Sequence, residues 1–262
     1  MSDGFLDERR PAEIEAAIRN LWAVESIDER FHNYGYKGER YEYALSVKDR
    51  CLTPTQLVEE RLAVVDRQLR ILDLGAGACM PLVHLREVFG DQVDLVAGSA
   101  HPPRVFSQES QSAIEESKID FRTGNAEFWK SLVDPSENFD IVFSRYGIRW
   151  FCDPLAAIER ILSQLSQGGI FWADPVRIPS NRGTFSRLLA KLDAVAIPQV
   201  MSHVDGDSLI KNFYVTKTSD SKESIFTDFQ YDVTVPLDSI LMSLRVNNNQ
   251  RRQASYTTTN AL

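Results

Sequence analysis

Residues 70–82 have the sequence RILDLGAGACMPL, in which a short apolar run carries one acid and ends at a glycine turn. Apolar runs of this length are typical of buried strands, and the leucine spacing after Pro81 indicates a helix. Glycine lets the backbone turn tightly and approach a ligand closely, so Gly75 and Gly77 mark a candidate binding turn. Asp73, just before that turn, is the side chain whose role the remaining sequence has to explain.

The composition is that of a folded protein with an acidic surface. Of the 262 residues, 43% are hydrophobic and 25% are charged, which suits one domain with extensions or at most two domains. The 29 basic and 37 acidic residues give a net charge of -8, and an acidic surface repels phosphate groups. We therefore expect no nucleic-acid partner and no anionic membrane partner. The net charge does not exclude a local basic patch.

Three further features bear on the compartment. Cys51, Cys79 and Cys152 lie far apart and form no CxxC pair, which is typical of free thiols in a reducing compartment. The N-terminal segment is charged and lacks the apolar core of a secretory signal. No apolar run reaches the ~20 residues that a membrane span needs. The sequence thus predicts a cytoplasmic protein without a metal site. It does not determine the oligomeric state.

From Arg70 onward, strand-like and helix-like segments alternate. Strands are expected at 70–74, 93–100, 119–124, 139–147 and 169–176, and helices at 81–89, 101–117, 126–133 and 153–165. Gly90 is expected to end the first of these helices, and Gly168-Gly169 the last. This alternation predicts an α/β fold with crossover connections and a doubly wound, mostly parallel sheet. Strand-like segments at 212–218 and 227–235 indicate an antiparallel C-terminal strand pair.

The sequence pattern divides the chain into three parts. Residues 1–68 are expected to form an N-terminal helical cap or lid, in which Thr53-Pro54 begins a helix with a capping box. Residues 69–245 hold the alternating segments and form the ligand-binding domain. Residues 246–262 are polar and have little to bury, so disorder is expected there.

The glycine turn does not fit a dinucleotide-binding site. The fingerprint GxGxxG/A fails at its third position, where this chain has Met80. A dinucleotide also brings a pyrophosphate, which gains nothing from an acid just before the turn. An NAD-dependent oxidoreductase is therefore disfavoured, and a cationic ligand suits Asp73 better.

Residues Leu72 to Gly77 resemble the first motif of class I S-adenosylmethionine-dependent methyltransferases, and the resemblance extends over about residues 70–176. It implies a Rossmann-like methyltransferase fold with S-adenosylmethionine as cofactor. It also implies that Asp73 receives the amino group of the ligand and that Gly75, Ala76 and Gly77 lie against its methionine and ribose parts. The alternative for Asp73 is a strand acid that accepts hydrogen bonds from loop amides.

Later segments resemble later motifs of the same family. Gly124-Asn125-Ala126 is similar to the adenine-binding segment, which implies that Asn125 and Ala126 contact the base. Residues 139–150 resemble the fourth strand with its following loop and place Ser144 and Arg145 at the cofactor. Residues 165–171 resemble the entry to the fifth strand, with Gln167 in place of the family's proline.

One position departs from the family. Its second strand usually ends in an acid that binds both ribose hydroxyls, and here Ser99, followed by Ala100, takes that place. Asp94 lies at the start of the strand and is expected on the far side of the sheet. Because a hydrogen bond to a neutral group is weaker than one to a charged group, Ser99 is expected to weaken cofactor binding about ten- to a hundredfold.

The resemblance implies methyl transfer to an oxygen or nitrogen atom of a small molecule, by in-line displacement on a sulfonium carbon. Close approach of the two reactants supplies much of the rate, and a base removes the acceptor's proton. His101, Tyr146 and Arg149 are the catalytic candidates, while Tyr34 belongs to a tyrosine-rich segment expected to cover the cofactor. Ser99 keeps an alternative open, a catalytically silent methyltransferase-like protein that binds a partner protein.

Overall fold

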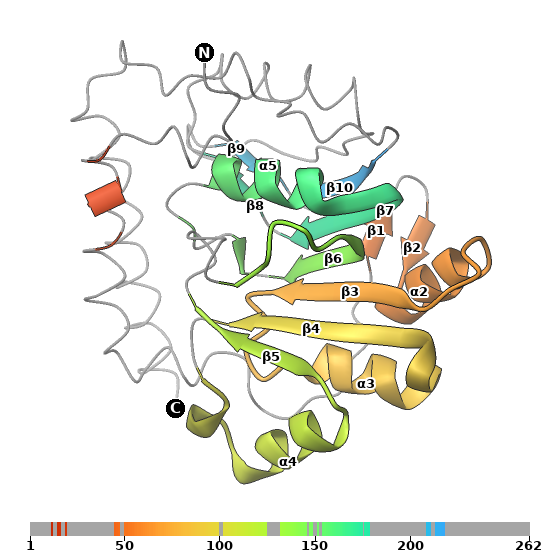
Figure 1. Cartoon of the computed structure of the whole chain (residues 1–262). Coiled ribbons are helices and arrows are strands. Elements are labelled where there is room, and N and C mark those ends of the chain that lie inside the picture. The colour runs from red at the N-terminus through yellow and green to blue at the C-terminus, as the bar shows by residue number, and fades with distance from the viewer. Residues whose placement is uncertain are drawn as a thin grey trace.

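The computed structural model describes residues 12, 15–16, 19, 45–47, 50–99, 102–124, 132–145, 147–148, 151, 154–174, 176–178, 208–210 and 213–217. Its centre is a six-stranded sheet in the order β10-β7-β6-β3-β4-β5 (Figure 1). The strands are β3 (Leu69–Leu74), β4 (Val93–Ser99), β5 (Asp120–Thr123), β6 (Phe139–Arg145), β7 (Leu165–Asp174) and β10 (Phe213–Thr216). Every pairing is parallel except that of β10 with β7. The predicted doubly wound, mostly parallel α/β fold is confirmed.

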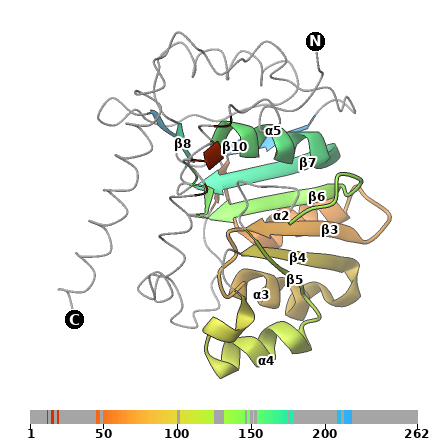
Figure 2. The same ribbon diagram turned by 60° about the vertical axis from the view of Figure 1, so that its left-hand side comes forward.

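Helices cover both faces of this sheet (Figure 2). Helices α2 (Pro54–Leu62), α3 (Met80–Phe89) and α4 (Gln108–Glu116) share one hydrophobic cluster with one face, and α5 (Pro154–Gln164) shares the other cluster. Because side chains alternate along a strand, Leu69 and Ile71 of β3 join the first cluster while Leu72 and Leu74 join the second. Asp73 therefore lies on the face that α2 and α3 cover.

The predicted start of α2 is confirmed. The Thr53 hydroxyl accepts from the Gln56 amide at 3.2 Å, and the Gln56 side chain accepts from the Thr53 amide at 2.9 Å. Pro54 occupies the first turn, where a missing N–H costs no hydrogen bond. Both amides at the helix start thus have partners within the chain.

Replacing Thr53 with alanine removes this cap and is expected to lower the free energy of unfolding by about 1 kcal/mol. Urea unfolding measures the loss. Thr55 is the matched control on the same helix, because its hydroxyl has no hydrogen-bond partner among the described residues. Equal losses in Thr53→Ala and Thr55→Ala would contradict the capping role.

Two strand pairs were not predicted. Strands β1 (Leu45–Val47) and β2 (Arg50–Leu52) pair antiparallel within the region predicted to be helical. Each of these strands is only three residues long, which is too short for a periodic sequence pattern to be recognised. Strands β8 (Val176–Ile178) and β9 (Ser208–Ile210) form the other antiparallel pair.

The predicted boundary between α5 and β7 is wrong. The helix ends at Gln164 and the strand begins at once with Leu165, whereas the sequence suggested a helix closed by the glycine pair. Gly168 has φ +67° and sits within β7, where the pairing of β7 with β6 shifts register. The Gly168 amide donates to the Lys217 carbonyl at 2.7 Å, so the irregular backbone is held by the chain at the end of β10.

Several expectations concern residues outside those described. They include most of the cap at 1–68, most of the helix at 126–133, the strand at 227–235 and the tail at 246–262. Of the predicted C-terminal strand pair, only the first member is described, as β10 antiparallel to β7. Among the helices that the structure describes, none is both long and apolar enough to cross a membrane.

Candidate functional site

The switch in strand order lies between β3 and β6. From β3 the chain runs outward through β4 to β5, and β6 then returns to the other side of β3. Ligands of open α/β sheets bind beyond the carboxyl ends of the strands at such a switch. The arrowheads of β3, β4 and β6 point to the same edge of the sheet (Figure 1), and the glycine turn follows β3 at that edge.

The glycine turn is held by the neighbouring strand. Gly75 has φ +82° and Gly77 has φ +54°, in the left-handed region that glycine tolerates without strain. The amides of Gly75 and Ala76 both donate to the carbonyl oxygen of Gly98 in β4, at 2.8 and 3.1 Å. The turn is therefore fixed to the end of β4 before the chain enters α3.

Asp73 is a buried carboxylate that has no hydrogen-bonding or ion-pair partner among the described residues. Its residue is 7% exposed, and it makes no hydrogen bond or ion pair with any described residue. Burial raises the pKa of the Asp73 carboxyl to about 7, because water no longer stabilises the ionised form. Burial, and next the charge of Asp73, also raise the pKa of the nearby Cys79 thiol. A cation bound beside Asp73 would supply the missing partner.

Ser144 and Gly147 bring the chain after β6 against the glycine turn. The Ser144 hydroxyl donates to the Leu74 carbonyl at 2.7 Å and accepts from the Ile148 amide at 3.0 Å. A Cβ built on Gly75 would lie 2.6 Å from the Gly147 Cα, so the two backbones touch. The hydroxyl of Ser144 keeps one acceptor lone pair beyond these two hydrogen bonds.

The end of β4 and its start are placed as predicted. Ser99 is buried at the carboxyl end, where its carbonyl accepts from the Gly124 amide at 2.9 Å. Asp94 lies at the amino end of β4, opposite the end at the glycine turn, and pairs with Arg70 at 3.1 Å. Ser99 is therefore the last residue of β4 and lies at the candidate site.

The structure brings together seven of the predicted site residues at the carboxyl ends of β3, β4 and β6. They are Asp73, Gly75, Ala76, Gly77, Ser99, Ser144 and Arg145. The other seven lie outside the described residues, and their roles stay predictions: Tyr34, Ala100, His101, Asn125, Ala126, Tyr146 and Arg149. Sequence reasoning missed the contributions of Gly98 and Gly147. Gly98 acts through its backbone carbonyl, which leaves no signal in the sequence. Gly147 did leave a signal, because a glycine just after a predicted strand indicates a turn or a close backbone contact.

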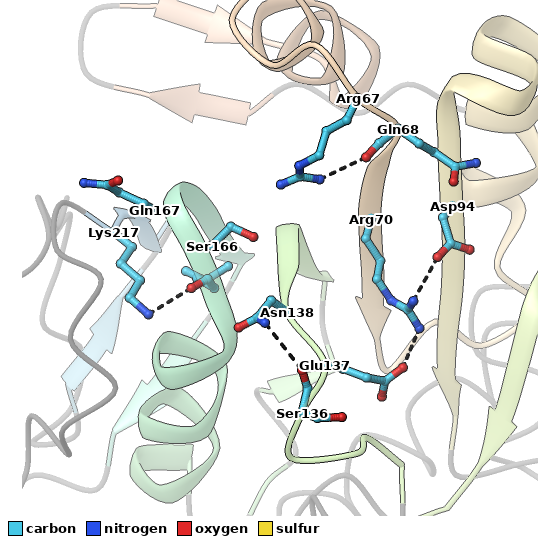
Figure 3. A pocket seen from close by; sticks show the side chains of 11 residues that line it. Arg67, Gln68, Arg70, Asp94, Ser136, Glu137, Asn138, Ser166, Gln167 and Lys217 are labelled. Carbon is cyan, nitrogen blue, oxygen red and sulfur yellow. Dashed lines mark hydrogen bonds and ion pairs between the residues drawn. The ribbon is translucent and has the colours of Figure 1, made fainter.

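A groove of about 750 Å³ lies at the opposite edge, where the parallel strands begin (Figure 3). Its charged lining residues are already paired within the chain. Arg70 pairs with Asp94 and Glu137, and Arg67 pairs with Asp140 behind the lining. The Lys217 ammonium donates to the Leu165 carbonyl at 2.8 Å. We therefore assign these side chains to the fold, and within the described residues no cluster of three His, Cys, Asp or Glu side chains could hold a metal ion.

Asp140 ties the start of β3 to the start of β6. It is 1% exposed and accepts two hydrogen bonds from the Arg67 guanidinium, at 2.8 and 2.7 Å. The Arg70 amide donates to the same carboxylate at 3.0 Å. Two neighbouring strands are thus held together at this edge, while their other ends carry the candidate site.

Residues 72–173 match the sequence family described as Methyltransferase domain, which confirms the predicted resemblance for that region. Among curated proteins, none matches the chain. Solved structures with a similar fold include the CurJ carbon methyltransferase, at 12% identity over 63% of this chain and 53% of that chain, with a TM-score of 0.44. The LepI complex with SAM is 15% identical over 62% of this chain and 46% of that chain, with a TM-score of 0.40. An rRNA methylase from Streptococcus thermophilus is 16% identical over 66% of this chain and all of that chain, with a TM-score of 0.42.

The chain spans about half the length of CurJ and of LepI. With TM-scores below 0.5, these likenesses assign no substrate to it. The family match supports methyl transfer in general. The prediction that the chain has no nucleic-acid partner is wrong, because the solved structures with a similar fold include an rRNA methylase. The physical reason is that net charge is a sum over the whole chain, whereas phosphate contacts depend on local charge.

Proposed function

We propose that the chain transfers a methyl group from S-adenosylmethionine to an oxygen or nitrogen atom of a small molecule. The observation that carries the proposal is the Asp73 carboxylate, which is buried beside the glycine turn without a described partner. A buried charge is stable only when it is paired or hydrogen-bonded. The amino group of S-adenosylmethionine is a cation of the kind that would pair with it.

The residues at the carboxyl ends of β3 and β4 fit such a ligand. Asp73 would receive the amino group, and the backbone of Gly75, Ala76 and Gly77 would lie against the methionine and ribose parts. Ser99 would contact the ribose with one hydroxyl, in place of a carboxylate. Bound there, S-adenosylmethionine supplies a methyl group on a positively charged sulfur atom.

The chain's own contribution to catalysis would be positioning and proton removal. Holding the acceptor atom in line with the methyl group removes most of the entropy cost of bringing two reactants together. An acceptor hydroxyl or ammonium also has to lose a proton, and His101 or Tyr146 would accept it, with Arg149 orienting the acceptor. These three roles remain part of the proposal.

Thermal unfolding of the full chain tests the cofactor. A ligand at a hundred times its dissociation constant stabilises a protein by about 2.7 kcal/mol, so S-adenosylmethionine and its demethylated product should raise Tm by about 5–11 °C. NAD is the control and should leave Tm unchanged. A shift with NAD alone, or no shift with any of the three at millimolar concentration, would count against the proposal.

Because Ser99 stands where the family has a ribose-binding acid, the second candidate function is a catalytically silent protein that binds a partner protein. A labelling experiment distinguishes this function from methyl transfer. The chain is incubated with S-adenosylmethionine carrying a tritiated methyl group, together with a small-molecule extract or with total RNA. Label in the small-molecule fraction supports the proposal, and label in RNA replaces the acceptor class. Cofactor binding without label in either fraction favours the silent protein.

A further inference from the structure

Two segments far apart in the sequence meet at the candidate site through one buried side chain. Ser144, the penultimate residue of β6, is fully buried, and its hydroxyl bonds to backbone atoms on both sides. On one side is the carbonyl oxygen of Leu74, which immediately precedes the glycine turn. On the other is the amide of Ile148, in the chain that leaves β6. The hydroxyl therefore bridges the cofactor-side turn and the segment after β6.

The backbones at this bridge approach so closely that only glycine fits. A Cβ on Gly147 would overlap the Leu74 carbonyl oxygen and lie 2.9 Å from the Ser144 Oγ. A Cβ on Gly75 would lie 2.6 Å from the Gly147 Cα. Contacts under 3.0 Å are not tolerated by a real Cβ, so a side chain at either position would push the two segments apart.

We propose that Ser144 is a positioning residue that couples the segment after β6 to the occupancy of the glycine turn. The inference rests on the proposed function, because the turn is where the methyl donor would bind. The segment after β6 contains Tyr146 and Arg149, two of the proposed acceptor-side groups.

The coupling has a physical basis in the shared contact. A ligand that orders the turn at Gly75 also orders the Leu74 carbonyl, and Ser144 passes that order to the Ile148 amide. Without the bridge, Gly147 and Ile148 would sample other positions. The apparent affinity for a ligand falls in proportion to the fraction of molecules in the binding-competent arrangement.

The variants Ser144→Ala and Gly147→Ala test this coupling in the full chain, with the demethylated cofactor product as the ligand. Ser144→Ala is expected to raise its Kd about tenfold, the effect of one lost hydrogen bond. Gly147→Ala should also raise the Kd, because its Cβ would push the backbone away from the Leu74 carbonyl and the Ser144 hydroxyl. Gly90→Ala is the matched control. Gly90 has φ +54° at the end of α3, with nothing within 4 Å of an added Cβ, so alanine there destabilises the fold by backbone strain alone. Its Kd should stay at the wild-type value.

Residue-resolved amide hydrogen exchange supplies a readout that a purely structural role does not move. In the wild type, ligand should increase protection at Gly75, Ala76 and Ile148. In Ser144→Ala the increase should persist at Gly75 and Ala76 and vanish at Ile148. The same increase at Ile148 in that variant, an unchanged Kd, or an equal loss of affinity in Gly90→Ala would overturn the inference while leaving the proposed function intact. A wild type that binds neither the cofactor nor its product would overturn both.

Discussion

Replacing Asp73 with asparagine is expected to make the ligand-free chain more stable at pH 8 and to remove its response to S-adenosylmethionine. Asparagine has the shape of aspartate without its charge, so it relieves the cost of a buried carboxylate that has no partner among the described residues. The same change removes the group that would pair with the cationic ligand. Stability and binding should therefore move in opposite directions.

The pH dependence of stability follows from the raised pKa. The folded-state pKa of Asp73 is about 7, compared with a model value of 3.8. Between these values the folded protein holds a proton that the unfolded chain has released, so the free energy of unfolding falls as pH rises. The contribution is full below about pH 4 and is lost once pH passes about 7. The gap corresponds to about 4 kcal/mol as an order of magnitude.

Urea unfolding at pH 5 and pH 8 isolates this effect as the difference between wild type and Asp73→Asn. The variant should gain stability over the wild type at pH 8 and much less at pH 5. Asp91→Asn is the matched control, because the Asp91 side chain is 99% exposed and its removal should leave the pH dependence intact. An Asp73→Asn chain that loses stability at pH 8 would show that the carboxylate is satisfied in the native state.

Binding should show the reverse pH dependence. Because the ligand needs the ionised carboxylate, protonation of Asp73 competes with it, and affinity should fall about tenfold for each pH unit below about 7. Isothermal titration calorimetry between pH 5.5 and 8 measures the slope. Flat affinity over this range, with binding intact in Asp73→Asn, would remove Asp73 from the site.

The parts of the fold that could be predicted are those encoded by local patterns. The run Ile71–Leu74 predicted a buried strand, and the structure divides its apolar side chains between the two hydrophobic clusters. The capping box at Thr53 predicted the start of α2 because both of its hydrogen bonds lie within four residues. Gly90 likewise marked the end of α3.

The parts that failed depend on partners distant in the sequence. Gly168-Gly169 looks like a helix stop, yet Lys217, nearly fifty residues later, supplies the hydrogen bonds that hold the glycine pair inside β7. Asp73 shows both sides of this limit. Its place before the turn could be predicted from the motif. That no described residue donates a hydrogen bond to it could not, because this depends on which side chains the neighbouring strands place around it.

Replacing Arg67 with methionine is expected to lower the free energy of unfolding by about 3 kcal/mol, the low end of the range for breaking a buried ion pair. The change leaves the Asp140 carboxylate buried with the Arg70 amide as its remaining hydrogen-bond donor. The low end applies because the Arg67 side chain is 52% exposed and Arg61 lies 3.8 Å from the carboxylate. Urea unfolding at pH 7 measures the loss, with Arg104→Met, at an exposed position, as the control.

Ranking the variants by their free energy of unfolding distinguishes the cost of a buried, unpaired charge from the cost of lost packing. Asp140→Asn should cost less than Arg67→Met, because the Arg67 that it leaves behind is half-exposed to water and Arg61 keeps its hydrogen bond to the Gln167 carbonyl. The double variant should then be more stable than Arg67→Met alone, since it lacks the buried carboxylate that Arg67→Met leaves without its guanidinium partner. Additive losses would contradict this account. Because the pair joins β3 and β6 at the edge opposite Asp73, the affinity of folded Arg67→Met for S-adenosylmethionine should match that of the wild type. A loss of affinity there would mean that the two ends of these strands are coupled through the sheet.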